Sequence, residues 1–166
     1  MKVFVTGSSG GIGAAICKKF KKNNYSLILT SSSEKKIEDL KNIYGDNHSY
    51  YSLDLSDVDN LQDNLNIISK DHKDISVIVN NAGITDDSLV IRMSNENWSK
   101  VIQTNLSSNY QIIKTLLPNM LSNRYGKIVG ISSIVGTTGN PGQTNYVAAK
   151  SGLSGLYKSI ALEVAR

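Results

Sequence analysis

The sequence predicts a doubly wound α/β fold, in which helices cover both faces of a parallel β-sheet. Two observations predict it: short, almost wholly apolar segments alternate with longer amphipathic ones, and a glycine-rich turn directly follows the first short segment. Fully apolar strands are typical of a sheet that is buried on both faces. Because right-handed crossovers leave few topologies, we expect the strand order 3-2-1-4-5.

Each expected strand is a short apolar run, and each is followed by a pattern of helical period. The strands are expected at 3–5, 25–30, 49–53, 75–79 and 127–131. The helices are expected at 10–23, 33–44, 56–69, 95–121 and 146–164. Ser33 is the expected N-cap of the second helix and Gly45 its stop, and Pro118 should kink the fourth helix or weaken its last turn.

The length and composition fit one domain spanning residues 1–166. The chain has 166 residues, 40% of them hydrophobic, which is enough for a real core. Its formal net charge of +4 comes from lysines scattered over helical segments, so solvated helix faces are the simpler explanation and no nucleic-acid partner is expected. No apolar run reaches the roughly 18 residues of a membrane-spanning helix, so no membrane partner is expected.

The single cysteine and the two histidines suggest neither a disulfide nor a metal site. Cys17 is the only cysteine and lies on the apolar face of the first expected helix, where a core residue is the simpler interpretation. His48 and His72 stand apart from other possible ligands. We therefore expect a reducing, cytoplasmic location; an organellar protein that has lost its transit segment would look the same.

The turn after the first strand matches a dinucleotide-binding fingerprint of Rossmann-type folds. Gly7 would permit the tight turn, Gly11 would let a pyrophosphate approach the backbone, and Gly13 would let the helix pack close to the strand. The positive end of the helix would then face the phosphates. The turn reads Thr6-Gly7-Ser8-Ser9-Gly10-Gly11-Ile12-Gly13.

The end of the second strand favours NADP over NAD. It reads Leu29-Thr30-Ser31-Ser32-Ser33, without the acidic residue that usually binds the ribose hydroxyls of NAD. Its hydroxyl groups, with the nearby Lys35-Lys36, suit a 2′-phosphate. The cofactor-binding candidates are Thr6, Gly7, Ser9, Gly11, Ile12, Gly13, Ser31, Asp54, Leu55, Asn81, Ala82, Gly83, Tyr146 and Lys150.

Two of these candidates have structural alternatives. Asp54, at the end of the third strand, could accept a hydrogen bond from an adenine amino group or lead into the next helix, for which Ser56 fits the N-cap better. In Asn80-Asn81-Ala82-Gly83, the small residues leave room for a ribose, while the amides could tie neighbouring strands together.

Tyr146 and Lys150 are four residues apart on an expected helix and so share one face. A phenol that donates a proton near neutral pH needs a pKa about three units below its ordinary ~10, or roughly 4 kcal/mol, and a neighbouring ammonium has the right sign. Ser133 could hydrogen-bond a carbonyl oxygen, and Asn105 could hold a water that relays protons to Lys150. Tyr-x-x-x-Lys pairs also occur by chance, but Ser133 and the Tyr146–Lys150 pair lie at the ligand-binding edge of the expected sheet.

The chain resembles the short-chain dehydrogenase/reductase family over its whole length. The resemblance is carried by Thr6-Gly7-x-x-x-Gly11-Ile12-Gly13, Asn80-Asn81-Ala82-Gly83, Asn105, Ser133, Tyr146 and Lys150, in the family's order and spacing. It implies a nicotinamide-dependent oxidoreductase with Asn105, Ser133, Tyr146 and Lys150 as its catalytic residues.

Within that family the chain is most similar to the β-ketoacyl reductases of fatty acid synthesis. The stretches that carry this similarity include Gly83-Ile84-Thr85, Ile91-Arg92-Met93, Thr104-Asn105-Leu106 and Gly139 to Tyr146. The resemblance implies an NADPH-dependent reduction of a β-ketoacyl group on acyl-carrier protein, a contact of that carrier with Arg124, and a homotetramer. A solvated charge at the end of a helix is the simpler interpretation of Arg124.

Two departures from the family pattern change these expectations. Related reductases often have an arginine at the position of Gly10, which weakens the expectation of NADP. Family members also continue past the position of Arg166 with two more strands and a substrate lid, so the resemblance implies a sheet truncated at the C-terminus. A reductase of acetoacetyl-CoA or another ketone, a non-catalytic dinucleotide-binding module and an inactive fragment stay open as alternatives.

Overall fold

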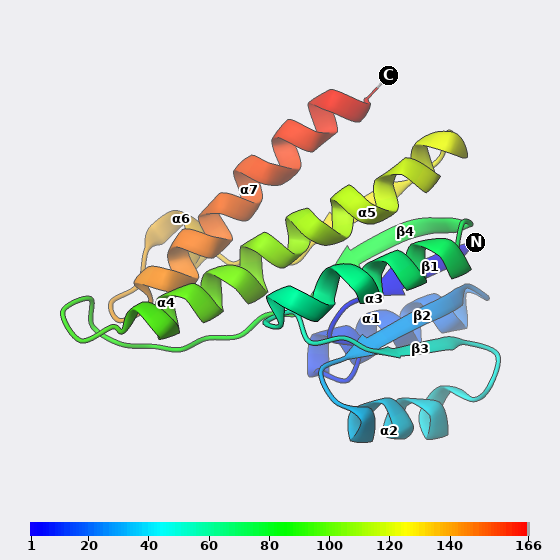
Figure 1. Ribbon diagram of the computed structural model, residues 1–166, viewed down its shortest axis with the longest axis horizontal. Helices are drawn as coiled ribbons and strands as arrows, with labels where there is room; N and C mark the ends of the chain where they lie inside the picture. Colours follow the sequence, from blue (N-terminus) through cyan, green and yellow to red (C-terminus); the bar gives the residue numbers. More distant parts are fainter. Residues whose placement is uncertain (166) are drawn as a thin grey trace.

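The computed structural model describes residues 1–165 and contains a five-stranded parallel sheet with helices on both faces (Figure 1). The strand order is β3-β2-β1-β4-β5, which confirms the predicted topology. The strands are β1 (Lys2–Val5), β2 (Ser26–Ser31), β3 (Ser49–Ser52), β4 (Ile75–Asn80) and β5 (Lys127–Gly130). The helical segments are α1 (Gly11–Lys22), α2 (Glu34–Tyr44), α3 (Val58–Asp71), α4 (Asn95–Ile102), η1 (Gln103–Ser107), α5 (Ser108–Ser122), α6 (Val135–Thr138) and α7 (Thr144–Val164).

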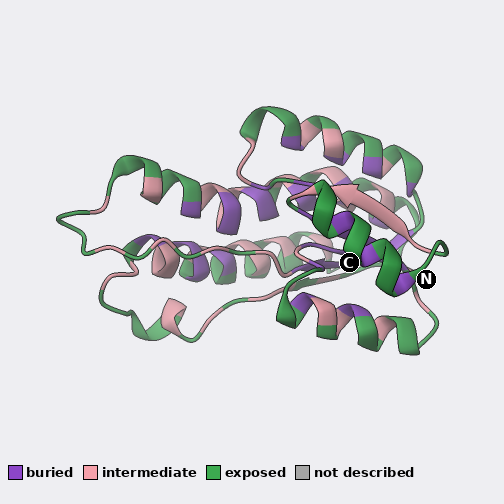
Figure 2. Ribbon diagram, turned by 90° about the horizontal axis from the view of Figure 1, so that it is seen from below, coloured by how far each residue is buried: buried purple, intermediate pink, exposed green. Residues whose placement is uncertain are grey.

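Alternating strand residues build a separate core on each face of the sheet. Phe4, Ile28 and Ile78 pack against α3 and α5, whereas their neighbours Val3 and Val5 pack against α1 and α2. The helices bury the side that faces the sheet and expose the other side (Figure 2). Both cores hold the carboxyl ends of β1, β2 and β4 side by side, where ligands bind in open α/β sheets.

Cys17 lies in the core between α1 and the sheet, as its position on the apolar face predicts. Its side chain is fully buried, and this burial raises the pKa of the thiol to about 11. A protonated, inaccessible thiol is unreactive, so Cys17 is a packing residue.

The helix predicted at 95–121 is continuous but contains a π-helical turn, η1, between α4 and α5. This wider turn leaves carbonyl groups for side chains to bind. The Ser108 hydroxyl donates to the Thr104 carbonyl oxygen at 2.7 Å, and Asn109 Nδ2 donates to that of Asn105 at 3.1 Å. Pro118 lies inside α5, which continues to Ser122.

The helix starts differ in part from the prediction. Asp57, not Ser56, caps α3, because its carboxylate accepts a hydrogen bond from the Asn60 backbone N–H at 3.1 Å. Ser33 occupies the N-cap position of α2, but its hydroxyl makes no capping bond. The short helix α6 was not predicted from the sequence.

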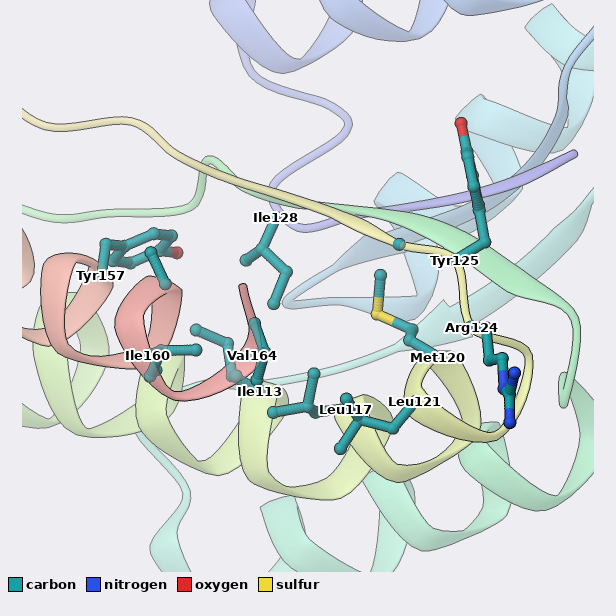
Figure 3. Close-up of a pocket in the computed structure, with 12 residues that line it drawn as sticks. Ile113, Leu117, Met120, Leu121, Arg124, Tyr125, Ile128, Tyr157, Ile160 and Val164 are labelled. Carbon is teal, nitrogen blue, oxygen red and sulfur yellow. The ribbon is translucent and has the colours of Figure 1, made fainter. Parts of the chain in front are cut away.

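An apolar groove of about 530 Å³ lies between α5, β5 and α7 (Figure 3). Within residues 1–165, the outer edge of β5 pairs with no other strand, and Val129 in that strand is 45% exposed. Over the same residues, no helix combines the length and the apolar character needed to cross a lipid bilayer. The groove walls include Ile113, Leu117, Met120, Ile128, Tyr157 and Ile160.

Candidate functional site

The glycine-rich turn forms a close-packed cradle between β1 and α1. Gly7 has a φ of +65°, a conformation that L side chains rarely adopt. A methyl group on Gly13 would overlap the Gly7 carbonyl oxygen and lie 2.7 Å from Asn81 Nδ2, whereas one on Gly11 would meet nothing within 4 Å. No side chain caps the first turn of α1. Its backbone N–H groups and the space over Gly11 therefore fit a pyrophosphate.

Thr6 and Asn81 fasten this cradle to the end of β4. The buried Thr6 hydroxyl accepts hydrogen bonds from the backbone N–H groups of Asn81 and Ala82, both at 3.0 Å. In return, Asn81 Nδ2 donates to the carbonyl oxygens of Thr6 at 2.9 Å and Gly7 at 3.1 Å. The predicted structural role of an asparagine amide is thus confirmed for Asn81.

A cleft of about 590 Å³ runs from this cradle along the carboxyl ends of β2, β3 and β4. It brings together the predicted cofactor-binding residues except Thr6, Tyr146 and Lys150: Thr6 lies buried beneath it, and the other two are on α7. Its lining comprises Gly7, Ser9, Gly10, Gly11, Ile12, Gly13, Thr30, Ser31, Ser32, Lys36, Leu53, Asp54, Leu55, Ser56, Asn81, Ala82, Gly83, Ile84, Lys100 and Thr104.

The end of this cleft beside β2 is polar, because side-chain hydroxyl groups and the positively charged Lys36 line it. The hydroxyls of Ser9 and Ser31 are 2.9 Å apart and join the cradle to β2. Lys36 also lines the cleft, whereas Lys35 does not. Asp54 accepts hydrogen bonds from the Ser56 backbone N–H at 2.9 Å and from the Ser56 hydroxyl at 2.7 Å, so it also shapes the entry to α3.

Lys150 and Tyr146 lie together on α7, as their spacing predicts. Lys150 Nζ is 5.6 Å from the centre of the Tyr146 ring and donates a hydrogen bond to the Ile131 carbonyl oxygen at 2.7 Å. Only 4% of Lys150 is exposed, and this burial lowers the pKa of its ammonium from the ordinary value. A methyl group on Gly83 would lie 3.6 Å from Lys150 Nζ, which places the ammonium beside the end of the cofactor cleft.

Asn105 is fully buried in η1, and its amide both accepts a hydrogen bond from the Ile84 backbone and donates one to it. Its Oδ1 accepts from the Ile84 N–H and its Nδ2 donates to the Ile84 carbonyl oxygen, each at 2.8 Å. A methyl group on Gly83 would be 3.3 Å from Asn105 Oδ1, so Asn105 and Lys150 converge on the same glycine. The amide thus orders the loop after β4, and the predicted water contact stays a prediction.

Ser133 is half-buried in the loop that follows β5, and that loop packs against α7 beside Lys150. The Ser132 hydroxyl donates to the Lys150 carbonyl oxygen at 3.2 Å, and a methyl group on Gly136 would lie 3.1 Å from the Lys150 backbone. The residues on both sides of Ser133 are therefore held against α7 at Lys150 and Ser151, and the contacts among residues 1–165 do not link this loop directly to the Tyr146 phenol.

The start of α7 is fastened by a residue that the sequence did not single out. Asn145 is fully buried; its Nδ2 donates to the Asp86 carbonyl oxygen at 3.0 Å, and its Oδ1 accepts from the Tyr146 N–H at 2.8 Å. Gln143 adds a hydrogen bond to Asp87 at 2.8 Å. Only its position before Tyr146 could have pointed to Asn145, because these partners are distant in the sequence.

Arg124 lies apart from these residues. It follows α5 and precedes β5, so it occupies the edge of the sheet opposite the carboxyl ends of the strands. Its side chain is exposed and contributes to the lining of the apolar groove (Figure 3). Any contact that it makes with a partner is therefore separate from the contacts of Tyr146.

Comparisons with known proteins agree with this geometry. The chain matches the short chain dehydrogenase family over residues 1–166. It is 45% identical over 161 residues to 3-oxoacyl-(acyl-carrier-protein) reductase FabG of Haemophilus influenzae, and this match covers 97% of the chain and 66% of the relative. The protein of the same name from Rickettsia felis is also 45% identical, with 97% of the chain and 65% of the relative covered.

A solved structure from the same family also matches this chain. A short-chain dehydrogenase from Streptomyces avermitilis superposes with a TM-score of 0.89 at 27% identity, which covers 99% of this chain and 60% of that structure. The chain spans less than two thirds of the length of the curated relatives described above. Since the family match extends over residues 1–166, the chain belongs to the short-chain dehydrogenase family.

Proposed function

We propose that this protein is an NADPH-dependent reductase that converts a β-ketoacyl group on acyl-carrier protein to the β-hydroxyacyl product in fatty acid synthesis. One observation carries the proposal: the buried Lys150 ammonium lies beside the Tyr146 ring and next to Gly83, where the cofactor cleft ends. The relatives named 3-oxoacyl-(acyl-carrier-protein) reductase support the choice of substrate.

The proposed chemistry assigns a separate task to each side chain. When bound, the reduced nicotinamide supplies the hydride that the carbonyl carbon accepts. Tyr146 donates its phenolic proton to the carbonyl oxygen, so the ketone becomes a secondary alcohol. The Ser133 hydroxyl donates a hydrogen bond to the same oxygen as negative charge develops there. The proton that Tyr146 gives up is replaced from solvent through Lys150, by way of the water that we expect near Asn105.

Lys150 is suited to position both the phenol and the cofactor. An ammonium has three N–H donors, and one of them is used by the Ile131 carbonyl oxygen. We propose that the others bind ribose hydroxyls when the cofactor is present. A positive charge this close to the Tyr146 ring favours the phenolate that remains after proton transfer.

The adenosine end of the cleft supports NADP as the cofactor. Ser9, Ser31 and Ser32 supply hydroxyl groups there, Lys36 supplies a positive charge, and the end of β2 carries no carboxylate. A 2′-phosphate is favoured by such donors, whereas NAD usually requires an acidic partner for its ribose. Lys36 can therefore replace the arginine that related reductases often have at the position of Gly10.

We also propose that the protein acts as a homo-oligomer through its outer helices. Tyr110 and Leu121 on α5 and Leu162 on α7 are exposed by 49%, 52% and 81%. Large exposed apolar side chains on adjacent helices are typical of an interface between subunits. Arg124, at the end of α5, is the proposed contact for the acidic carrier protein.

A non-catalytic dinucleotide-binding module is the second candidate. It is favoured by one observation, namely that the hydrogen bonds of the loop that carries Ser133 run to Lys150 and Ser151 and not to the Tyr146 phenol. Such a module would bind NADPH in the same cleft without turning over a ketone. Cofactor binding must therefore be measured beside turnover in every experiment on this protein.

Replacement of Tyr146 by phenylalanine tests the reductase directly. We expect NADPH oxidation in the presence of acetoacetyl-carrier protein to fall at least ~100-fold, because the proton donor is removed while the ring is kept. NADPH affinity, measured by fluorescence, should change less than about threefold. Binding of NADPH by the unmodified protein without turnover of either acetoacetyl-carrier protein or acetoacetyl-CoA would favour the non-catalytic module.

Replacement of Lys36 by alanine tests the choice of cofactor. Loss of the cation should weaken NADPH binding about tenfold and leave NADH binding within twofold, since only the 2′-phosphate would contact this side chain. Lys35→Ala is the matched control, because it removes the same charge one residue outside the cleft. A tighter affinity of the unmodified protein for NADH than for NADPH would contradict the proposal.

Gly11→Ala and Gly13→Ala should separate ligand binding from folding. A methyl group at position 11 meets open space, so the protein should fold normally and lose dinucleotide affinity at least tenfold. At position 13 the methyl group would collide with backbone, so we expect a loss of stability of about 1–3 kcal/mol. Thermal melting with and without NADPH measures both effects, and unchanged NADPH affinity of Gly11→Ala would exclude this cleft as the pyrophosphate site.

A further inference from the structure

The phenol of Tyr157 joins α7, the helix of Tyr146 and Lys150, to two other elements. Its hydroxyl accepts a hydrogen bond from Asn80 Nδ2 at 2.8 Å and donates one to Asn109 Oδ1 at 3.0 Å. Asn80 is the last residue of β4, and Asn109 is in the first turn of α5. Both asparagines are only 3% exposed. Tyr157 thus connects α7 to the carboxyl end of β4 and to α5.

The same network continues to the backbone of Asn105. Asn109 Nδ2 donates to the Asn105 carbonyl oxygen at 3.1 Å, within the π-helical turn. The Oδ1 atom of Asn109 therefore binds Tyr157, and its Nδ2 atom binds η1. A wide π turn lacks the regular α-helical bond pattern, so side-chain contacts of this kind fix its shape.

A second chain of hydrogen bonds leads from Asn80 to Lys150. The Asn80 carbonyl oxygen accepts from the Ile131 N–H at 2.9 Å, and the Ile131 carbonyl oxygen accepts from Lys150 Nζ at 2.7 Å. Lys150 and Tyr157 are seven residues apart, about two turns of α7, so they lie on one face of the helix. Asn80 is thus tied to this face at two points.

The Asn80 amide depends on Tyr157 for its hydrogen bond, and the Tyr157 ring is closely packed. Asn80 Oδ1 is buried without a hydrogen bond among residues 1–165, so the bond to Tyr157 is the one hydrogen bond of that amide. A methyl group on Gly130 would lie 2.5 Å from the Tyr157 ring, so β5 and the ring are packed against each other. Figure 3 shows Tyr157 on the α7 side of the apolar groove, facing Ile128. Burial raises the pKa of this phenol to about 12, which keeps it protonated as a donor.

We propose that Tyr157 is a positioning residue: its hydroxyl, through Asn80 and Asn109, sets the placement of Lys150 and of the π turn around Asn105 relative to the end of β4. The inference rests on the proposed reductase function. It assigns no contact between Tyr157 and substrate or cofactor. Removal of the hydroxyl leaves two buried polar groups unpaired, and α7 or η1 then shifts to satisfy them.

The test replaces Tyr157 by phenylalanine in the full chain, with Tyr125→Phe, at a 45% exposed tyrosine in the segment after α5, as the matched control. At saturating NADPH and acetoacetyl-carrier protein, kcat should fall about tenfold, while KM for NADPH stays within twofold. Hydrogen exchange of peptides covering 103–109 should become faster in Tyr157→Phe and not in Tyr125→Phe. A kcat within twofold of the unmodified protein, or an equal loss of kcat and NADPH affinity, would overturn the inference.

Two further variants separate the network from a general loss of stability. Asn109→Leu should lower kcat to a similar degree, and the double variant Asn109→Leu/Tyr157→Phe should be no worse than either single one, because both act through one contact. Additive losses would refute the network. If the unmodified protein binds NADPH without turnover, the reductase proposal fails, and the exchange rates of 103–109 then decide the structural inference alone.

Discussion

The proposed site depends on one interaction, the hydrogen bond between the buried Lys150 ammonium and the Ile131 carbonyl oxygen. A charge that is 4% exposed costs free energy unless it is well bound, so the chain must provide partners for it. Ile131 is itself held to the end of β4 through Asn80. The ammonium therefore links α7 to the sheet and also places a positive charge beside Tyr146 and Gly83.

Lys150 both holds the fold together and shapes the site. The same is true of the cofactor half, where polar groups that join the strand ends also form the walls of the ligand cleft. Thr6 and Asn81 use their side chains to bind the glycine-rich turn to the end of β4, and Ser9 and Ser31 join that turn to β2. The cleft is thus bounded by strand ends that are locked to one another. Such preorganisation reduces the ordering that ligand binding would require.

Much of this architecture is predictable because it depends on local patterns. Apolar strands, the glycine turn and the Tyr146–Lys150 spacing specify the sheet order and bring the two side chains together. The π turn at 103–107, the Asp57 cap and the short helix α6 were not predicted, because an apolar period does not distinguish a π turn from an α turn and neighbouring residues compete for each cap.

The partners of buried polar residues are the least predictable part. Tyr157 reads as an ordinary aromatic residue on a helix, and its bonds to Asn80 and Asn109 join residues that are 77 and 48 positions away. Likewise, Asn105 was expected to bind a water, but its amide also fixes the backbone of Ile84. Such contacts arise from the assembled tertiary structure, which a single sequence does not display.

The most direct test of the account is the replacement of Lys150 by methionine, which keeps most of the side-chain volume and removes the charge. The account predicts a folded protein with weakened NADPH affinity and a kcat for the β-ketoacyl substrate at least ~100-fold lower, because the cation next to Tyr146 is lost. A Lys150→Met protein that reduces the substrate within threefold of the unmodified rate would contradict it.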